Sequence, residues 1–208
     1  LQLLEAMFPI AEKMGIWMGL EIHAPTALNS ELVKKIVSWA QQYPDIIGLY
    51  PDMGIFAKYP RPYNRERQIK QGTLTRETAL YIEESYRKGV AQADVEKEVG
   101  KRKPKAGDTA YVATVYNSAR SLQKPEDLIP LIPYCKNIHG KFYEMSEGDT
   151  YEDTMIIYPE VMKVLMENGY DGYVCSEYEG QRNMDIPDVD EIVQVRRQHV
   201  MLKRLLGV

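Results

Sequence analysis

Four residues that can bind a divalent metal ion lie at or near the ends of short apolar runs that are typical of β-strands. They are Glu21, Asp52, His139 and Glu177, in the segments GLEIH, GLYPD, NIHGKF and YVCSEYE. Divalent ions favour oxygen and imidazole ligands, and parallel strands present their carboxyl ends at one edge. The spacing therefore predicts a site for one divalent ion, with manganese or magnesium favoured by the carboxylates and zinc as the alternative.

Each residue also has a simpler explanation when it is taken alone. Glu21 and Glu177 could be solvated carboxylates at the rim. Asp52 could be a turn residue before Gly54, and His139 could be a hydrogen-bonded core imidazole. The location of all four at strand ends on one side, where charge is otherwise rare, favours a shared site.

Strand-like and helix-like patterns alternate along the chain, as they do in βαβ units around a parallel sheet. We expect strands at 16–23, 46–51, 137–143 and 173–177. The expected helices cover 4–14 with a kink at Pro9, a stretch from a cap at Asn29 or Ser30 to near Pro44, 75–99, 108–122, 159–169 and a last helix capped by Asp188.

The alternation within the strands brings two further polar residues into the predicted site. Glu21 and His23 share one side of the first strand, and His139 and Lys141 share one side of the third. Lys141 is a candidate catalytic residue that could hold a substrate oxygen. It could equally pair with a ligand carboxylate, and the sequence leaves both roles open.

We expect an α/β fold, a parallel (β/α) barrel of the TIM type, of which this chain is the C-terminal half. The chain forms a single domain over residues 1–208, and residues 53–133 form a loop and helical insertion within it. Its 208 residues carry about four βα units, whereas a complete eight-stranded barrel has roughly 250 residues. An open four-stranded sheet would leave two edges unpaired, so we expect the gene product to be longer.

Composition excludes several classes of protein. Lys and Arg total 26 against 30 Asp and Glu, which gives a net charge of 26 − 30 = −4 and no electrostatic footprint for nucleic acid. The one basic run, 101–105, is typical of a solvated linker. Two cysteines are too few for a disulfide framework, and we expect a cytoplasmic protein. No apolar stretch is long enough to cross a membrane, and no secretory signal is visible.

The segments GLEIH, LYPDMG, IHGKFYEM and NGYDGYVCSEYEGQR resemble the last four strands of the xylose isomerase-like barrel superfamily, the sugar isomerases and epimerases. The resemblance covers essentially the whole chain outside the helical insertion. In that superfamily a Glu, an Asp, a His and a Glu from successive C-terminal strands commonly hold one divalent ion. Glu21, Asp52, His139 and Glu177 match those positions in order, which implies the same role for them.

Two positions depart from the sugar epimerases. Those enzymes often have a His three residues after the Asp, where this chain has Ile55. They usually lack a His two residues after the first Glu, where this chain has His23. With KFYEM, SEYEGQR and the insertion, the chain more closely resembles the large (alpha) subunit of the bacterial C-glycoside deglycosidases. That resemblance implies β-elimination from a 3-keto glycoside and a small second subunit, and we also expect an oligomer.

The chemistry that the resemblance implies is removal of a proton next to a sugar carbonyl that the metal binds. His23 is the natural base for a deglycosidase, because a neutral imidazole suits this task near pH 7. Glu21 and Glu177 would double as proton carriers in the alternative enzymes, a ketose 3-epimerase or an aldose–ketose isomerase. Arg182 and Phe56 are candidate substrate contacts, although a surface role fits Arg182 equally well.

Two further classes are less favoured. A metal-dependent endonuclease on the same barrel would need more histidines than the three present and a basic face. A non-catalytic sugar-binding relative would keep the fold while losing metal ligands, and all four are present here.

Overall fold

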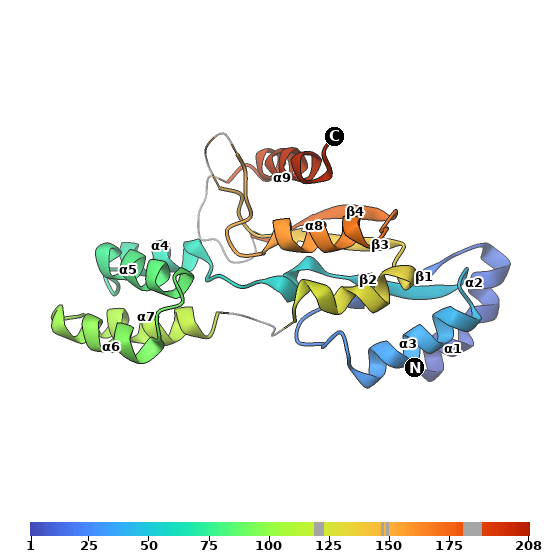
Figure 1. Ribbon diagram of the computed structural model, residues 1–208, viewed down its shortest axis with the longest axis horizontal. Helices are drawn as coiled ribbons and strands as arrows, with labels where there is room; N and C mark the ends of the chain where they lie inside the picture. Colours follow the sequence, from blue (N-terminus) through green and yellow to red (C-terminus); the bar gives the residue numbers. More distant parts are fainter. Residues whose placement is uncertain (119–122, 147, 149, 181–188) are drawn as a thin grey trace.

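The fold is given by a computed structural model of the 208-residue chain (Figure 1). The structure describes residues 1–118, 123–146, 148, 150–180 and 189–208. Short parallel strands form the centre of the molecule, and a group of helices extends from one end of it (Figure 1).

Among the described residues, four strands run parallel to one another in chain order. They are β1 (Met18–Ile22), β2 (Ile47–Pro51), β3 (Asn137–Phe142) and β4 (Tyr173–Tyr178). β1 pairs with β2, and β3 pairs with β4. Two isolated parallel bridges, Leu49 with Cys135 and Asp52 with His139, connect β2 to β3. The prediction of four parallel strands at these places is confirmed, whereas their closure into a barrel stays a prediction.

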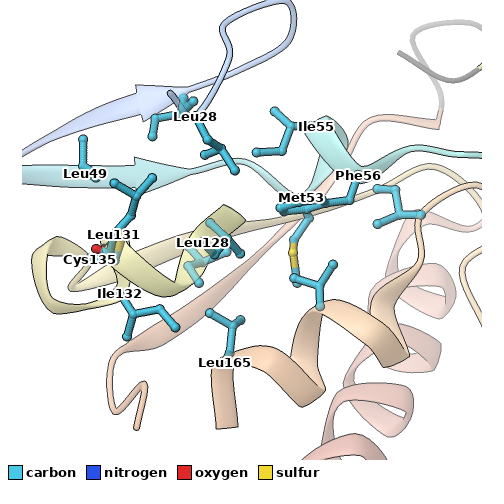
Figure 2. Close-up of a cluster of buried hydrophobic side chains, with 14 of the residues drawn as sticks. Leu28, Leu49, Met53, Ile55, Phe56, Leu128, Leu131, Ile132, Cys135 and Leu165 are labelled. Atoms are coloured by element: carbon cyan, nitrogen blue, oxygen red, sulfur yellow. Dashed lines mark hydrogen bonds between the residues drawn. The ribbon is translucent and has the colours of Figure 1, made fainter. Parts of the chain in front are cut away.

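One face of the strands is buried in the main hydrophobic core. Leu49 of β2 and Ile138 of β3 are at most 1% exposed there. They belong to the same cluster as Ile36 and Leu165, which come from two helices. Figure 2 shows Leu165 on its helix, pointing towards the other labelled core side chains. Burial of this apolar face stabilises the sheet and leaves the other face for polar residues.

In the part of the chain that the structure describes, five helices accompany the strands. They are α1 (Gln2–Ala6), α2 (Phe8–Met14), α3 (Glu31–Gln42), α8 (Tyr158–Glu167) and α9 (Glu191–Leu206). Ser30 caps α3, because its side chain accepts a hydrogen bond from the Val33 amide at 3.3 Å. Within the described ranges, no helix has both the length and the apolar composition that a membrane crossing needs.

Two helix boundaries differ from the sequence prediction. Pro9 does not kink one long helix; the chain breaks at Met7 and Pro9 lies in the first turn of α2, where proline is well tolerated. The predicted cap Asp188 lies outside the described residues. Asp190 caps α9 instead, accepting a hydrogen bond from the Val193 amide at 3.0 Å.

The insertion between β2 and β3 is more helical than predicted. Its elements are η1 (Met53–Phe56), α4 (Pro62–Lys70), α5 (Arg76–Arg87), α6 (Gln92–Lys101), α7 (Ala106–Tyr116) and η2 (Pro125–Tyr134). The single helix expected over 75–99 is two helices, because Gly89 takes a left-handed conformation (φ 73°) between α5 and α6. Helices α4 to α7 enclose a second hydrophobic cluster: Leu74, Ala79, Ile82, Val95, Val99, Tyr111, Val112 and Val115.

A candidate metal centre at the strand ends

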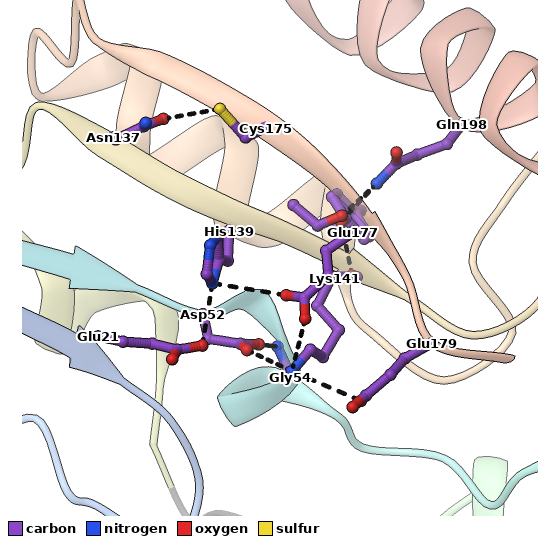
Figure 3. A network of polar contacts seen from close by, with 12 residues as sticks. Glu21, Asp52, Gly54, Asn137, His139, Lys141, Cys175, Glu177, Glu179 and Gln198 are labelled. Carbon is purple, nitrogen blue, oxygen red and sulfur yellow. Dashed lines mark hydrogen bonds and ion pairs between the residues drawn. The ribbon is translucent and has the colours of Figure 1, made fainter. Parts of the chain in front are cut away.

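The four predicted ligands come together in the structure (Figure 3). Glu21, His139 and Glu177 lie in β1, β3 and β4, and Asp52 directly follows β2. One potential ligand atom from each residue lies within 4.8 Å of the other three. The bridge between Asp52 and His139 brings these two ligands to the same level. Adjacent ligands of an octahedral ion at about 2.1 Å lie about 3 Å apart and opposite ligands about 4 Å apart, so this spacing is of the right order.

His139 lies between two of the carboxylates. Its Nδ1 is 2.9 Å from Glu21 Oε1 and 3.5 Å from Glu177 Oε2. The ring of Tyr50 packs against the imidazole, with ring centroids 4.0 Å apart at an interplanar angle of 48°. The imidazole is therefore held in place by β2 while its nitrogen faces the carboxylates.

Asp52 is fully buried and each of its oxygens has a different contact. Oδ1 accepts a hydrogen bond from the Gly54 amide at 2.6 Å, which caps η1. Oδ2 forms an ion pair with Lys141 Nζ at 2.6 Å. A Cβ at position 54 would lie 2.8 Å from Asp52 Oδ1, so glycine is needed for this close turn. Asp52 is thus a turn residue and a member of the cluster.

Lys141 is a buried cation within the same cluster. Its side chain is 2% exposed, and Nζ lies 3.5 Å from Glu177 Oε1 and 3.5 Å from Glu179 Oε2. Burial alone lowers the pKa of Lys141, but the hydrogen bond to Asp52 and the nearby carboxylates outweigh it, so the pKa is raised above its ordinary value. Of the two roles that the sequence left open, the structure shows the pairing with a carboxylate.

The donor set fits a divalent cation. The three carboxylates of the four-residue set, Glu21, Asp52 and Glu177, carry three formal negative charges and Lys141 carries one positive charge, which leaves 1 − 3 = −2. Glu177 Oε2 is buried; it lies 3.5 Å from His139 Nδ1 but accepts no hydrogen bond from the described residues. A buried carboxylate oxygen without a partner is unfavourable unless a cation contacts it. Oxygen ligands with one imidazole are a donor set that divalent ions accept.

His23 lies beside this cluster in sequence, immediately after β1. The residue is exposed, and its Nδ1 is 2.6 Å from the carbonyl oxygen of Ala24. Because a carbonyl oxygen only accepts hydrogen bonds, this contact requires the proton on Nδ1. The neutral imidazole then has its lone pair on Nε2.

The two predicted substrate contacts have different outcomes. Phe56 lies in the main hydrophobic core beside Met53 and is 3% exposed (Figure 2). This burial disfavours stacking on a substrate, and that role stays a prediction. Arg182 lies outside the described residues.

Glu179 is a member of the cluster that the sequence analysis missed. It directly follows β4, two residues after Glu177, and its amide continues the pairing with β3 by donating a hydrogen bond to the Phe142 carbonyl at 3.0 Å, so the strand alternation extends to it. Lys141 was predicted because it lies two residues after His139 on the same side of a strand. The same spacing from Glu177 to Glu179 could have predicted Glu179.

The fold and the site together define an α/β protein with a candidate metal centre at the carboxyl ends of parallel strands. No protein-family model matches the chain. The chain is 27% identical over 222 residues to the 3'-dehydrocarminate deglycosidase alpha subunit of Microbacterium sp, in an alignment that covers 99% of the chain and 61% of that relative.

Two further relatives carry a similar name. The C-glycoside deglycosidase alpha subunit of Arthrobacter globiformis is 27% identical over 210 residues, which cover 99% of the chain and 59% of the relative. That of Microbacterium trichothecenolyticum is 28% identical over 216 residues, which cover 92% and 56%. The chain thus spans less than two thirds of the length of the curated relatives that it matches.

Proposed function

We propose that the protein is a divalent-metal-dependent enzyme that acts on carbohydrates and cleaves C-glycosides. The observation that carries this proposal is the cluster of Glu21, Asp52, His139 and Glu177. It occurs in a chain whose relatives, at 27–28% identity, are named as deglycosidase alpha subunits. The proposed substrate is a 3-keto C-glycoside, which loses its aglycone by β-elimination.

The four strands belong, in this proposal, to a (β/α) barrel of the xylose isomerase-like type. Three observations support it: the strands are parallel, they follow one another in chain order, and the candidate ligands lie at their carboxyl ends. Barrel enzymes place their active sites at this end of the strands.

His23 is the proposed general base. It follows the strand that carries Glu21, and its Nε2 has the lone pair that accepts a proton. The base removes the proton from C2 of the sugar, next to the C3 ketone. The electron pair of the broken C2–H bond forms a C1=C2 double bond as the bond from C1 to the aglycone breaks, and the aglycone carbon takes up a proton.

The four-residue cluster would hold the cofactor, one manganese or magnesium ion. A bound divalent ion acts as a Lewis acid that stabilises negative charge developing on the ketone oxygen. Lys141 Nζ, which lies 3.5 Å from Glu177 Oε1 and 3.5 Å from Glu179 Oε2, would supply a further hydrogen-bond donor beside the ion.

A ketose 3-epimerase or aldose–ketose isomerase is the second candidate. Glu21 and Glu177 come from β1 and β4, the first and last strands of the row, and both approach His139. Two carboxylates that approach from different strands suit proton removal and return on opposite faces of a sugar.

The names of the relatives also bear on partners. Because they are called alpha subunits, we propose that the complete protein works with a second, smaller subunit.

The test is an assay of the complete protein, with Mn²⁺ and its second subunit, on 3-keto C-glycosides and on free ketohexoses. We expect aglycone release that falls by about 10²- to 10⁴-fold in His23→Ala, with the manganese content unchanged. His199→Ala is the matched control, since His199 Nε2 lies 3.0 Å from Ser176 Oγ and belongs to α9. Ketohexose epimerisation that survives His23→Ala, without aglycone release, would refute the deglycosidase and support the second candidate.

A further inference from the structure

The candidate metal centre contains a cation of its own. Lys141 Nζ is 2.6 Å from Asp52 Oδ2 and 3.5 Å from Glu177 Oε1, which are two of the four candidate ligands (Figure 3). Its side chain is 2% exposed, so solvent screens this charge weakly. The ammonium and a divalent ion would therefore repel each other over a short, buried distance.

The Lys141 ammonium would nevertheless stabilise the site when no metal ion is bound. Three ligand carboxylates close together repel one another, and Lys141 is the buried cation that offsets this repulsion. A site built this way is pre-formed without its ion, but it binds the ion less tightly than the carboxylates alone would.

Glu179 gives the ammonium a second partner. Its Oε2 lies 3.5 Å from Nζ, its side chain is 17% exposed, and it is outside the four-residue ligand set (Figure 3). A displacement of about 1 Å would bring this pair to full hydrogen-bond distance.

The stem of Lys141 restricts where the ammonium can go. The Lys141 carbonyl accepts a hydrogen bond from Tyr158 Oη at 2.7 Å, and that hydroxyl accepts one from Gln198 Nε2 at 2.9 Å. A Cβ on Gly54 would lie 3.1 Å from Lys141 Cδ, so the aliphatic stem is packed against this turn. The backbone and stem are fixed, and the end of the side chain is the part left to move between Asp52 and Glu179.

We propose that Lys141 is a built-in counter-cation of the metal centre, which neutralises Asp52 in the empty site and shifts towards Glu179 when the ion binds. Glu179 is then a positioning residue for Lys141. This inference rests on the proposed metal centre.

The test is isothermal titration calorimetry, in which Mn²⁺ alone is added to the substrate-free complete protein. Lys141→Met removes the competing charge, so we expect it to tighten Mn²⁺ binding by roughly tenfold or more. Glu179→Gln takes away the second partner, and we expect binding weaker by about three- to tenfold. In the Lys141→Met background the effect of Glu179→Gln becomes much smaller, because the two residues act as a pair.

Matched controls lie on α8, where Lys163 and Glu167 form an exposed pair at 3.8 Å. We expect Lys163→Met and Glu167→Gln to leave Mn²⁺ affinity unchanged. Lys141→Gln is a second variant in case Lys141→Met does not fold. It removes the charge but keeps a hydrogen-bond donor for Asp52, and we expect it to tighten Mn²⁺ binding as well.

The outcomes separate this inference from the proposed function. If the wild-type protein binds one Mn²⁺ but both Lys141 variants bind it equally or more weakly, the counter-cation is refuted and the metal centre stands. If the wild-type protein binds no Mn²⁺, both are refuted. Additive effects of the two substitutions would refute the coupling of Lys141 to Glu179.

Discussion

At the scale of single residues, the atoms that converge at the strand ends determine which metal ion the proposed centre would prefer. Three carboxylates and one imidazole offer mainly hard oxygen ligands, which favour manganese or magnesium over softer ions. Glu177 Oε2 is buried and accepts no hydrogen bond from the described residues, although it lies 3.5 Å from His139 Nδ1, so a bound cation would stabilise it. The negative charge of the site comes from carboxylates that converge at one place. The small net charge of the whole chain, −4, does not account for it.

Asp153 is a second buried carboxylate, and it lies outside the metal centre. It is 8% exposed and accepts hydrogen bonds from the amides of Tyr143, Met155 and Ile156. Burial raises its pKa from 3.8 to about 6, although the backbone hydrogen bonds lower it in part. Because the folded-state pKa is above the unfolded one, its contribution to stability is fully present below pH 4 and is lost as the pH rises through 6.

This shift predicts a pH dependence that Asp153→Asn removes. Between pH 4 and pH 7 the unfolding free energy of the wild-type protein should fall relative to the variant by about 2 kcal/mol, which is most of the effect of a shift of about two pKa units. Urea unfolding of both proteins at several pH values measures this. Glu160→Gln, at an exposed position in the first turn of α8, is the control, and a difference between wild type and Asp153→Asn that stays constant with pH would contradict this prediction.

At the scale of elements, the helical insertion depends on close backbone contacts that the sequence does not reveal. Gly107 in the first turn of α7 is the clearest case, since a Cβ there would lie 2.1 Å from the Thr73 carbonyl oxygen. Gly100 near the end of α6 has nothing within 4 Å of the same added atom. Two glycines in one helical cluster therefore have different roles.

These two glycines predict opposite effects of alanine. We expect Gly107→Ala to destabilise the protein by about 1–3 kcal/mol, because the added methyl group overpacks a backbone contact. Gly100→Ala should stabilise it by up to about 1 kcal/mol, because alanine favours the helix. Thermal or urea unfolding distinguishes the two, and equal effects of both substitutions would show that the contact with Thr73 does not constrain α7.

The strands were predictable and much of the insertion was not, for physical reasons. Apolar alternation located β1 to β4 and placed Glu21, His139 and Glu177 on one side. The break at Gly89 and the start of α4 at Pro62 do have local signals, a left-handed glycine and a proline in the first turn, but the helical periodicity over 75–99 and the loop-like residues before Pro62 obscured them. The ion pair between Lys141 and Asp52 depends on the register of β3 against β2, and periodicity within one strand carries no information on register.

At the scale of the whole molecule, the two outer strands present open edges in the described structure. β1 and β4 each pair with one neighbour, while β2 and β3 are also bridged to each other. Tyr173 at the start of β4 is 76% exposed, which is unusual for an aromatic residue in a strand. In the proposed barrel both edges pair with further strands of the complete protein.

The barrel proposal predicts slow hydrogen exchange at both edges. In the complete protein, the amides of β1 and β4 should be protected to the same degree as those of β2 and β3. Hydrogen–deuterium exchange with mass spectrometry measures this strand by strand. Rapid exchange confined to β1 and β4 would contradict a closed barrel and favour an open sheet.

The central claim is that Glu21, Asp52, His139 and Glu177 hold one divalent ion. Its most direct test is an anomalous difference map, at the manganese absorption edge, from crystals of the complete protein grown with Mn²⁺. The account predicts a single strong peak between these four side chains, at the carboxyl ends of the strands. A map with no peak there, or with manganese bound only elsewhere, would contradict it.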